Sequence, residues 1–542
     1  MNISEIILNS FQEEHLNKIK DIFKYHSFAI DKSKTGSGKS IIASKFIQES
    51  SIKNGIIVCS VSIENDWKNR IIKYNLPISY IISYETLRGK KDSMPNHNLL
   101  LKDIDGNFYP TDYLIDMIKQ GFILILDEFQ RIKNNTDQTK AVKAISKYIT
   151  QYNKENNKII SYIYCISYSP FDTEETCVNF FYTVGIILNP LFDRNTKKLI
   201  GIYELIEYTN KFNKEKTNYI LSKNEITSKT TLNVCYQLCV DILLPIISSY
   251  MIIEENIFSK QSIYYGYFNI PDEGHNLIKS GINMIHNSKK KEKKFVFDNQ
   301  ISKNLYKDFS NGDDIDDMSG IIHGMITIQA TKTKYILVDA VKKCFESIKN
   351  VKVVLFFDNK IPLNLAMKEL SMYNPIDITG NRNKEDRTQI ISKFQEANLD
   401  SRLLLFISKI GSEGIELDDQ DGNYPRVGFG IPGYSMIQML QIPGRLNRFK
   451  TKSNSLFFWI YSISDEYCEQ SVINSINRKS KVLTDINNDM IIPYSYKKIF
   501  GDEIYDLNKL LIDAGNEIYH VEKKEEKIET ITIFKSSFPS LF

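Results

Sequence analysis

Short apolar runs alternate with amphipathic stretches along much of the chain. Continuous apolar runs occur at 27–30 and within 121–134, 350–359 and 402–417, and each has the length of a strand buried on both faces of a parallel sheet. The first run is followed at 40–50 by apolar residues at helical spacing. Strands that alternate with helices in this way predict an α/β fold with parallel sheets.

Length and charge limit the class of protein further. The 542 residues exceed one ordinary core and predict roughly three to four domains. The chain is 42% hydrophobic and 25% charged, which is typical of a soluble globular protein. Its formal net charge is only +3, so binding to nucleic acid would require positive charge gathered on one surface.

Cysteine spacing and hydropathy predict an intracellular protein without a membrane span. The seven cysteines are scattered and show neither a Cys-x-x-Cys pair nor zinc spacing, which favours a reducing compartment. The first residues lack the order of a signal peptide. The longest apolar window, 236–253, contains Asp241 and Pro245 and predicts a buried helix pair.

A glycine-rich stretch, DKSKTGSGKS at 31–40, lies between the first predicted strand and the first predicted helix. Gly36 and Gly38 allow backbone N–H groups to turn towards phosphate oxygens, Lys39 can neutralise the β- and γ-phosphates, and Ser40 can hold Mg²⁺. Ser33 stands where the commonest pattern has its first glycine. A flexible loop without function is the alternative interpretation of such a stretch.

A carboxylate pair follows the second predicted strand. Asp127 and Glu128 of the sequence DEFQ come at the carboxyl end of the run, where open α/β sheets bind ligands. Asp127 is placed to hold Mg²⁺ through water, and Glu128 to orient or deprotonate the attacking water. An acidic turn after a strand is common in itself, but beside a glycine-lysine-serine loop it predicts the second part of a nucleotide site.

The later sequence carries a further set of polar signatures. The segment 377–395 reads as a strand end and turn before a helix, and 402–417 as a strand that enters a glycine turn. In QMLQIPGRLNRF, at 438–449, the spacing of Gln441, Arg445 and Arg448 predicts that all three lie on one side of a helix.

Taken in order over roughly residues 10 to 450, these segments resemble superfamily 2 helicases and translocases. SKTGSGKS matches motif I, DEFQ motif II, GSEGIEL motif V and QIPGRLNR motif VI. The closer likeness is to Swi/Snf-type translocases of double-stranded DNA and to the related ATPases of large DNA viruses. IIVCSVSIENDW at 56–67 (motif Ia), ISYETL at 82–87 (motif Ib) and DEFQRIKN carry it.

The resemblance implies two RecA-like parallel-sheet lobes in tandem, with a mainly helical insertion and a small C-terminal extension. The expected boundaries are 1–172 for lobe 1, 173–328 for the insertion, 329–470 for lobe 2 and 471–542 for the extension. The insertion, which contains the basic run KKKEKK at 289–294, and the extension match nothing recognisable.

The family's cofactors are ATP and Mg²⁺, and its site residues carry over by motif. The resemblance implies catalytic roles for Lys39, Asp127, Glu128, Gln130, Arg445 and Arg448, the two arginines acting as arginine fingers. Magnesium would be held by Ser40 and Asp127. The implied nucleotide contacts are Gln12, where the family places a glutamine that reads adenine, Ser33, Lys34, Thr35, Gly36, Ser37, Gly38, Lys39, Ser40 and Gln441.

Motifs Ia, Ib, IV and V are where the family grips a nucleic-acid backbone. Here they offer Ser60, Ser62, Thr86, Asn359, Ser408 and Lys409. The resemblance implies DNA in preference to RNA as the track, with transcription or replication machinery as candidate partners. The AT-rich character of the sequence suggests a large DNA virus or a cytoplasmic element, and hence host cytoplasm or virion.

Three residues depart from the family pattern. Gln130 stands where His or Asp is more usual, Ser60 where Pro is common, and Tyr168 in the predicted motif III, ISYSPFD, in place of a small residue. Two alternatives to a DNA translocase therefore stay open. One is an RNA helicase, and the other is a non-catalytic scaffold that binds nucleic acid with a degenerate ATPase. A small-molecule kinase is a weaker alternative, because kinases do not need the second-lobe motifs.

Overall fold

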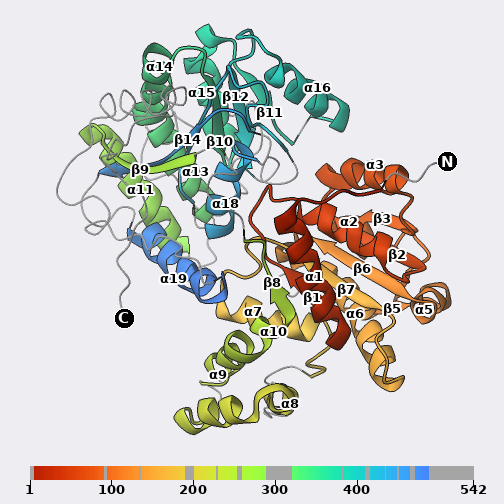
Figure 1. Cartoon of the computed structure of the whole chain (residues 1–542). Coiled ribbons are helices and arrows are strands. Elements are labelled where there is room, and N and C mark those ends of the chain that lie inside the picture. The colour runs from red at the N-terminus through yellow and green to blue at the C-terminus, as the bar shows by residue number, and fades with distance from the viewer. Residues whose placement is uncertain are drawn as a thin grey trace, which may run out of the picture. The chain divides into compact units, whose positions relative to one another are not determined.

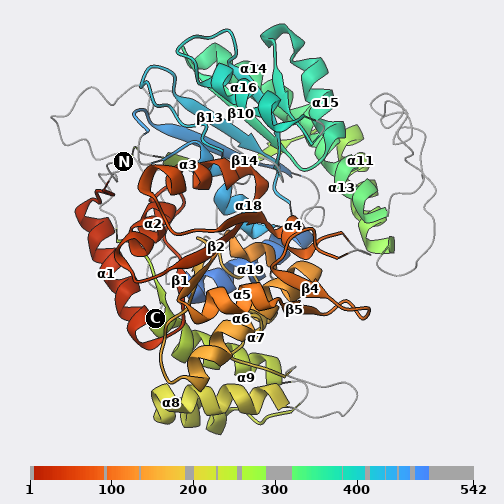
Figure 2. The same ribbon diagram turned by 90° about the vertical axis from the view of Figure 1, so that its right-hand side faces the viewer.

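The computed structural model describes residues 5–90, 94–132, 136–189, 200–227, 230–252, 259, 261–288, 320–380, 382–408, 415–433, 435–448, 451–463 and 470–487. The chain divides into two compact units (Figures 1 and 2). Unit 1 comprises residues 1–254 and 479–491, and unit 2 comprises residues 255–478 and 492–542. Each unit is built around one parallel sheet.

The sheet of unit 1 has six strands in the order β3-β2-β6-β7-β1-β8, and every pairing in it is parallel. Its strands are β1 (Phe28–Asp31), β2 (Asn54–Cys59), β3 (Tyr80–Ser83), β6 (Phe122–Asp127), β7 (Tyr162–Ile166) and β8 (Ser248–Ser249). The apolar runs at 27–30 and 121–126 therefore form strands, as predicted. A separate antiparallel pair joins β4 (Leu100–Lys102) and β5 (Phe108–Pro110).

Helices cover both faces of this sheet, which explains why its central strands are apolar at every position. All six residues of β6 are buried. Successive residues, such as Leu124 and Ile125, belong to the core clusters on opposite faces of the sheet. One face packs against α1 (Ser10–Tyr25), α2 (Lys39–Glu49) and α3 (Glu64–Tyr74). The other packs against α5 (Asp112–Lys119) and α6 (Asp137–Glu155). The same core cluster continues through α7 (Glu174–Thr183), which contacts α6, and through α9 (Thr231–Leu238) and α8 (Ile200–Lys223).

The sheet of unit 2 repeats the architecture, again with six parallel strands, in the order β11-β12-β10-β13-β14-β9. Its strands are β9 (Gln261–Asn269), β10 (Lys352–Phe357), β11 (Ile376–Ile378), β12 (Leu403–Ile407), β13 (Arg426–Gly430) and β14 (Ser455–Ile463). Its helices are α11 (Asp272–Ser288), α13 (Gly320–Lys332), α14 (Val338–Ser347), α15 (Lys360–Glu369), α16 (Lys384–Gln395) and α18 (Met436–Gln441). The predicted fold class, two α/β lobes with parallel sheets, is confirmed.

The segment expected as an insertion contributes to both sheets. Residues 173–254 belong to unit 1 and end in β8, whereas residues 255–328 belong to unit 2 and include β9. The division into compact units falls at 254, within this segment. The expected boundaries at 172 and 328 stay predictions. Much of the segment is helical, but KKKEKK lies outside the described residues.

The apolar window 236–253 contains parts of several short elements. It takes in the end of α9, a π-helical turn (Cys239–Leu243), α10 (Leu244–Ile247) and then β8. No helix within the described part of the chain is long and apolar enough to cross a membrane. The remaining short helix of unit 1 is α4 (Tyr84–Arg88), and α19 (Gln470–Asn487) forms the described start of the expected C-terminal extension.

Candidate nucleotide-binding site

The glycine-rich loop connects β1 to α2, as its sequence predicts. Gly36 and Gly38 have φ angles of 82° and 95°, which residues with a side chain rarely adopt. Gly38 is the N-cap of α2, whose helix begins at Lys39 and runs for 11 residues. The loop therefore leads into the N-terminus of a helix, whose backbone N–H groups and positive dipole end are the arrangement that binds phosphate.

Lys39 is folded against its own loop. Its Nζ donates to the carbonyl oxygens of Ser33, at 2.8 Å, and of Lys34, at 3.2 Å. Both acceptors lie on the loop that a phosphate would occupy. The ammonium is thus already at the loop, and a phosphate oxygen would offer it a charged acceptor in place of two neutral ones.

Ser33 faces away from the loop into a buried polar network. Its backbone N–H and its hydroxyl both donate to Oδ1 of Asp31, and its hydroxyl oxygen accepts the backbone N–H of Met251 at 2.9 Å. Both donors of Ser33 are therefore engaged inside the fold. This accounts for a serine at the position where a glycine is usual, since here the side chain has a structural partner.

The centre of that network is a pair of buried side chains, Asp31 and His15. His15 Nε2 lies 3.1 Å from Asp31 Oδ1, and the two side chains are 1% and 0% exposed. Burial would raise the pKa of Asp31, but the charge and hydrogen bond of His15, the charge of Lys39 and the Ser33 hydroxyl together lower it. The network ties α1 to the first residues of the phosphate loop.

Gln12 also contacts the loop. Its Nε2 donates to the carbonyl oxygen of Ser37 at 3.1 Å, and its Oε1 accepts the backbone N–H of Asn9. A Cβ atom added at Gly38 would lie 2.6 Å from Gln12 Nε2, so this glycine also makes room for the glutamine. The structure brings Gln12 to the nucleotide loop, while its role in reading adenine stays a prediction.

Asp127 and Glu128 lie at the same edge of the sheet as the loop. Asp127 ends β6 and Asp31 ends β1, and both pair with Ile166 of β7 from its two sides. Two strand spacings of about 4.8 Å place their Cα atoms roughly 10 Å apart. The chain therefore folds so that the sequence signatures of phosphate and magnesium binding meet at one edge.

Glu128 adopts a left-handed backbone conformation, with φ of 55°. This region is uncommon for a residue with a side chain and costs of order 1 kcal/mol or more. The carboxylate accepts a hydrogen bond of 2.6 Å from Nε2 of Gln130. Gln130 therefore contacts the predicted water-orienting group directly, so this departure from the family pattern retains a hydrogen-bonding role.

The carboxylate of Asp127 lies in a poor environment for a negative charge. The residue is 5% exposed. Burial and the neighbouring charge of Glu128 raise its pKa to about 7, against the opposing effects of a hydrogen bond from Trp67 and the charge of Lys39. A bound cation would favour the ionised form.

The available donor set fits magnesium held jointly by protein and nucleotide. Ser40, at the N-terminus of α2, supplies a hydroxyl, and Asp127 supplies a carboxylate. Mg²⁺ is commonly bound by one or two protein oxygens together with substrate phosphates and waters. Within the described residues, no cluster of three or more His, Cys, Asp and Glu side chains could form a protein cage for a metal.

Motif VI does not form the continuous helix that its spacing predicts. Helix α18 ends at Gln441, and Pro443–Arg445 form a 3₁₀ turn. The prediction that Gln441, Arg445 and Arg448 share one side of a helix is therefore wrong. The reason is Pro443, which has no N–H to donate and whose ring disfavours a preceding helical turn. Arg445 is 2% exposed and Arg448 is half-buried.

The residues expected to contact nucleic acid follow strands of both sheets. In unit 1, Ser60 and Ser62 follow β2 with their hydroxyl oxygens 2.8 Å apart, and Thr86 lies exposed on α4, where its backbone N–H donates to Ser83 Oγ. In unit 2, Asn359 precedes α15 and Ser408 follows β12. Lys409 and most of GSEGIEL lie outside the described residues. The contacts themselves stay predictions.

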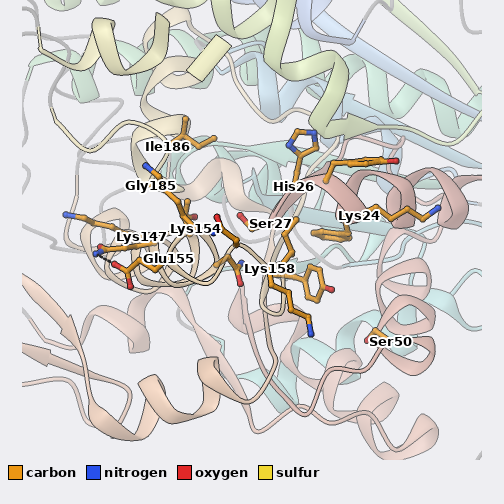
Figure 3. Close-up of a pocket in the computed structure, with 18 of the residues that line it drawn as sticks. Lys24, His26, Ser27, Ser50, Lys147, Lys154, Glu155, Lys158, Gly185 and Ile186 are labelled. Carbon is orange, nitrogen blue, oxygen red and sulfur yellow. Dashed lines mark hydrogen bonds between the residues drawn. The ribbon is translucent and has the colours of Figure 1, made fainter. Parts of the chain in front are cut away.

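A large groove lies at the opposite edge of the unit 1 sheet (Figure 3). It has a volume of about 1420 Å³ and is lined where α1, α2 and α6 end and where β1 and β7 begin. Six lysines line it: Lys20, Lys24, Lys147, Lys154, Lys158 and Lys211.

These lysines do not together form a binding site for an anion. Lys20, Lys24 and Lys211 pair with Glu49, Asp21 and Glu207. Lys154 and Lys158 lie near the C-terminal end of α6, which carries negative partial charge, and Lys147 lies within that helix. Burial lowers the pKa of His26 from its ordinary value, so this ring adds no charge at neutral pH. The predicted nucleotide site, with the loop and Asp127, lies at the other edge of the sheet.

Comparison with known proteins bears on the class of this protein. No family model matches the chain. The chain is 23% identical over 526 residues to a protein of Acanthamoeba polyphaga mimivirus provisionally named an ATP-dependent RNA helicase, and the match covers 90% of this chain and 85% of that protein. Together with the two parallel sheets and the order of the motifs, this similarity covers most of the chain. The chain resembles superfamily 2 helicase-like ATPases.

A solved structure, the SWI2/SNF2 ATPase core of Sulfolobus solfataricus in complex with double-stranded DNA, also matches. It is 13% identical, and the match covers 90% of this chain and 96% of that one at a TM-score of 0.30. With a TM-score this low, the resemblance to helicase-like ATPases rests on the topology and motifs of this chain and on the viral relative.

Some residues of this site were not identified from the sequence. His15, Asp31, Trp67 and Tyr84 contact the loop or Asp127, although none belongs to the predicted set. Trp67 and Tyr84 do lie inside motifs Ia and Ib. The signal available for Asp31 was its place at the end of the strand before the loop.

Proposed function

We propose that the protein couples ATP hydrolysis to movement along nucleic acid. The observation that carries the proposal is the meeting of the glycine-rich loop and Asp127–Glu128 at one edge of a parallel sheet, on the two strands that flank β7. A phosphate-binding helix terminus, a lysine, a magnesium ligand and a carboxylate for the attacking water are the parts that phosphoryl transfer to water needs.

The residues of unit 1 have separate tasks in this reaction. The loop and Lys39 bind the β- and γ-phosphates, and Ser40 and Asp127 hold Mg²⁺, which neutralises charge that develops on the phosphates. Glu128 orients the attacking water. Gln130 Nε2 lies 2.6 Å from Glu128 Oε2 and holds this carboxylate in place. Unit 2 supplies Arg445 and Arg448 to the γ-phosphate.

We propose duplex DNA as the nucleic acid along which the protein moves, because motifs Ia and Ib resemble those of DNA translocases. RNA is the second candidate, and the name of the mimivirus relative favours it. Exposed hydroxyls such as those of Ser62 and Thr86 suit backbone contacts, which position a nucleic acid but carry no sequence information. We therefore expect binding with little sequence preference and a strong dependence on salt.

ATPase assays with no nucleic acid, duplex DNA, single-stranded DNA and RNA test the proposal. We expect stimulation that is largest with duplex DNA and fades between about 50 and 200 mM salt. Lys39→Ala should lose nearly all activity, because it removes the charge at the phosphates while leaving the core intact. Lys53→Ala, an exposed lysine after α2, is the matched control and should keep the wild-type rate.

The outcomes separate the alternatives. Equal rates with every nucleic acid and with none would contradict the motor, and a rate unaffected by Lys39→Ala would contradict the site. Stimulation by RNA alone would support ATP-driven movement along nucleic acid, with RNA in place of duplex DNA as the substrate. Binding of nucleic acid without any ATP hydrolysis would favour the scaffold.

A further inference from the structure

The carboxylate of Asp127 accepts a hydrogen bond from a side chain 60 residues away. Trp67 Nε1 donates to Asp127 Oδ2 at 2.8 Å, and both partners are buried, at 1% and 5% exposed. Trp67 comes from α3, the helix that follows β2. The strand β2 is the direct neighbour of β6, so the fold brings this helix to the end of the strand that bears Asp127.

A second buried side chain contacts the backbone of the same residue. The hydroxyl of Tyr84 donates to the carbonyl oxygen of Asp127 at 3.0 Å, and Tyr84 is 0% exposed. It begins α4, after β3. Asp127 is therefore held at its carboxylate from α3 and at its carbonyl from α4.

The need of a buried indole N–H for a hydrogen-bond acceptor would by itself explain a hydrogen bond to any acceptor. A buried Trp N–H needs a partner, and a carbonyl oxygen usually serves. Here the acceptor is the side chain predicted to bind Mg²⁺. A hydrogen bond to a charged group is both stronger and more directional than one to a carbonyl, so it restricts the rotation of the carboxylate. Groups that orient a metal ligand in this way change metal affinity when they are removed.

We propose that Trp67 and Tyr84 are positioning residues for Asp127, with Trp67 holding the carboxylate and Tyr84 the backbone for Mg²⁺ bound with a nucleotide. The inference rests on the proposed function, because it concerns the same site. Trp67 is the larger contributor, since it contacts the carboxylate itself.

The two tryptophans of the chain make a direct measurement possible. The other, Trp459, lies on β14 in unit 2, so Trp459→Phe leaves Trp67 as the sole tryptophan. In that variant we expect addition of Mg²⁺ with a non-hydrolysable ATP analogue to change the indole emission. The change should saturate at the concentration that calorimetry gives for binding, and the analogue with a chelator should not produce it.

The second measurement compares Trp67→Phe with Trp459→Phe as the matched control. Trp67→Phe keeps an aromatic ring and removes the N–H. We expect the Mg²⁺ concentration for half-maximal binding of the analogue to rise about tenfold, as for the loss of other groups that orient metal ligands. Binding of the analogue without Mg²⁺ should be unchanged, and Tyr84→Phe should show a smaller rise.

Each outcome decides the matter. Calorimetric binding that needs Mg²⁺, with constant emission from Trp67, would overturn the inference, and so would an unchanged Mg²⁺ requirement in Trp67→Phe. Either result would leave the proposed ATPase intact. Absence of any nucleotide binding would overturn both. If Trp67→Phe fails to fold, the emission measurement still decides, because it uses the native Trp67.

Discussion

At the residue scale, the ionised carboxylate of Asp127 is electrostatically unfavourable in the nucleotide-free fold. Its carboxylate is buried beside Glu128, and its pKa is raised to about 7. A group whose pKa is raised by folding stabilises the fold in its protonated form, and this contribution is lost as the pH rises through that value. At neutral pH and above, the ionised Asp127 therefore lowers the stability of the nucleotide-free protein.

We expect Asp127→Asn to stabilise the nucleotide-free protein at about pH 8. A rise of roughly three pKa units, at 1.36 kcal/mol per unit, sets an upper limit of about 4 kcal/mol. The difference should shrink as the pH falls and become small near pH 4, close to the ordinary pKa of an aspartate, where the unfolded carboxyl begins to be protonated as well. Thermal unfolding followed by circular dichroism between about pH 4 and 8 measures this.

The exposed Asp21→Asn is the control, and it should show no such pH-dependent gain. Adding Mg²⁺ and an ATP analogue should reverse the order, because only the wild type retains the ligand. If Asp127→Asn is less stable than wild type at pH 8 without nucleotide, the assignment of this burial cost is contradicted.

Local sequence predicted the loop, Lys39 and the Asp127–Glu128 pair because each depends on neighbouring residues. The partners of these groups come from far along the chain, as with Trp67 and Asp127. Which buried donor reaches which acceptor depends on the order of strands in the sheet. That order, β2 beside β6 and β1 beside β7, cannot be read from residue types alone.

At the scale of elements, one buried network connects α1, β1 and β8 to the nucleotide loop. His15 from α1 bonds Asp31 at the end of β1, and its Nδ1 lies 3.3 Å from the hydroxyl of Ser249 on β8. Ser33 joins the network at the first turn of the loop. The orientation of α1, and with it Gln12, is therefore coupled to the base of the loop through polar contacts that are buried at His15, Asp31 and Ser33.

Removing one member of this network leaves a buried charge without its partner. We expect His15→Leu to lower the free energy of unfolding by about 3 kcal/mol at neutral pH. The pKa of Asp31 is lowered in the fold, so its contribution to stability is present above its ordinary pKa and is lost as the pH falls through the lowered value. The effect of His15→Leu should therefore diminish at acid pH, below the ordinary pKa of an aspartate.

Urea unfolding at neutral and acid pH measures the effect of His15→Leu. His15→Gln, which keeps an N–H donor, should lose less stability. Glu14→Gln on the exposed side of α1 should be nearly neutral, since surface pairs such as Glu14–Lys18 contribute little. A loss that is independent of pH would indicate that packing, not the charge of Asp31, explains the effect of His15.

Strands were easier to predict than helix ends. The central strands are buried on both faces, so their apolar runs stand out. The spacing of Gln441, Arg445 and Arg448 predicts a helix longer than α18, which ends at Gln441. The helix ends there because Pro443 follows. Strand β8 has two residues, and its place beside β1 follows from the fold of unit 1 as a whole rather than from its own sequence.

At the scale of the whole molecule, the two units carry different parts of the proposed reaction. Unit 1 holds the loop, Asp127 and Glu128, and unit 2 holds Arg445 and Arg448. In the proposed cycle, nucleotide binding depends mainly on unit 1, whereas the transition state also needs positive charge from unit 2. The two steps should therefore respond differently to changes in unit 2.

We expect Arg448→Ala to lower the catalytic rate by about a hundredfold or more, the scale of an arginine finger. The affinity for ATP should change much less, because the loop and Lys39 belong to unit 1. Arg448 is the better first variant, since Arg445 is 2% exposed and its removal would also disturb packing. Steady-state ATPase rates, with nucleotide affinity from calorimetry, separate the two effects.

The control for Arg448→Ala must remove an arginine from the same unit without touching the site. Arg382→Ala is suitable, because Arg382 is exposed and pairs with Asp377 of β11. It should keep both rate and affinity. A rate unchanged in Arg448→Ala would mean that this arginine takes no part in hydrolysis. An equal loss of affinity and rate would mean that it binds the nucleotide in the ground state as well, because only interactions made in the transition state alone lower the rate without weakening binding.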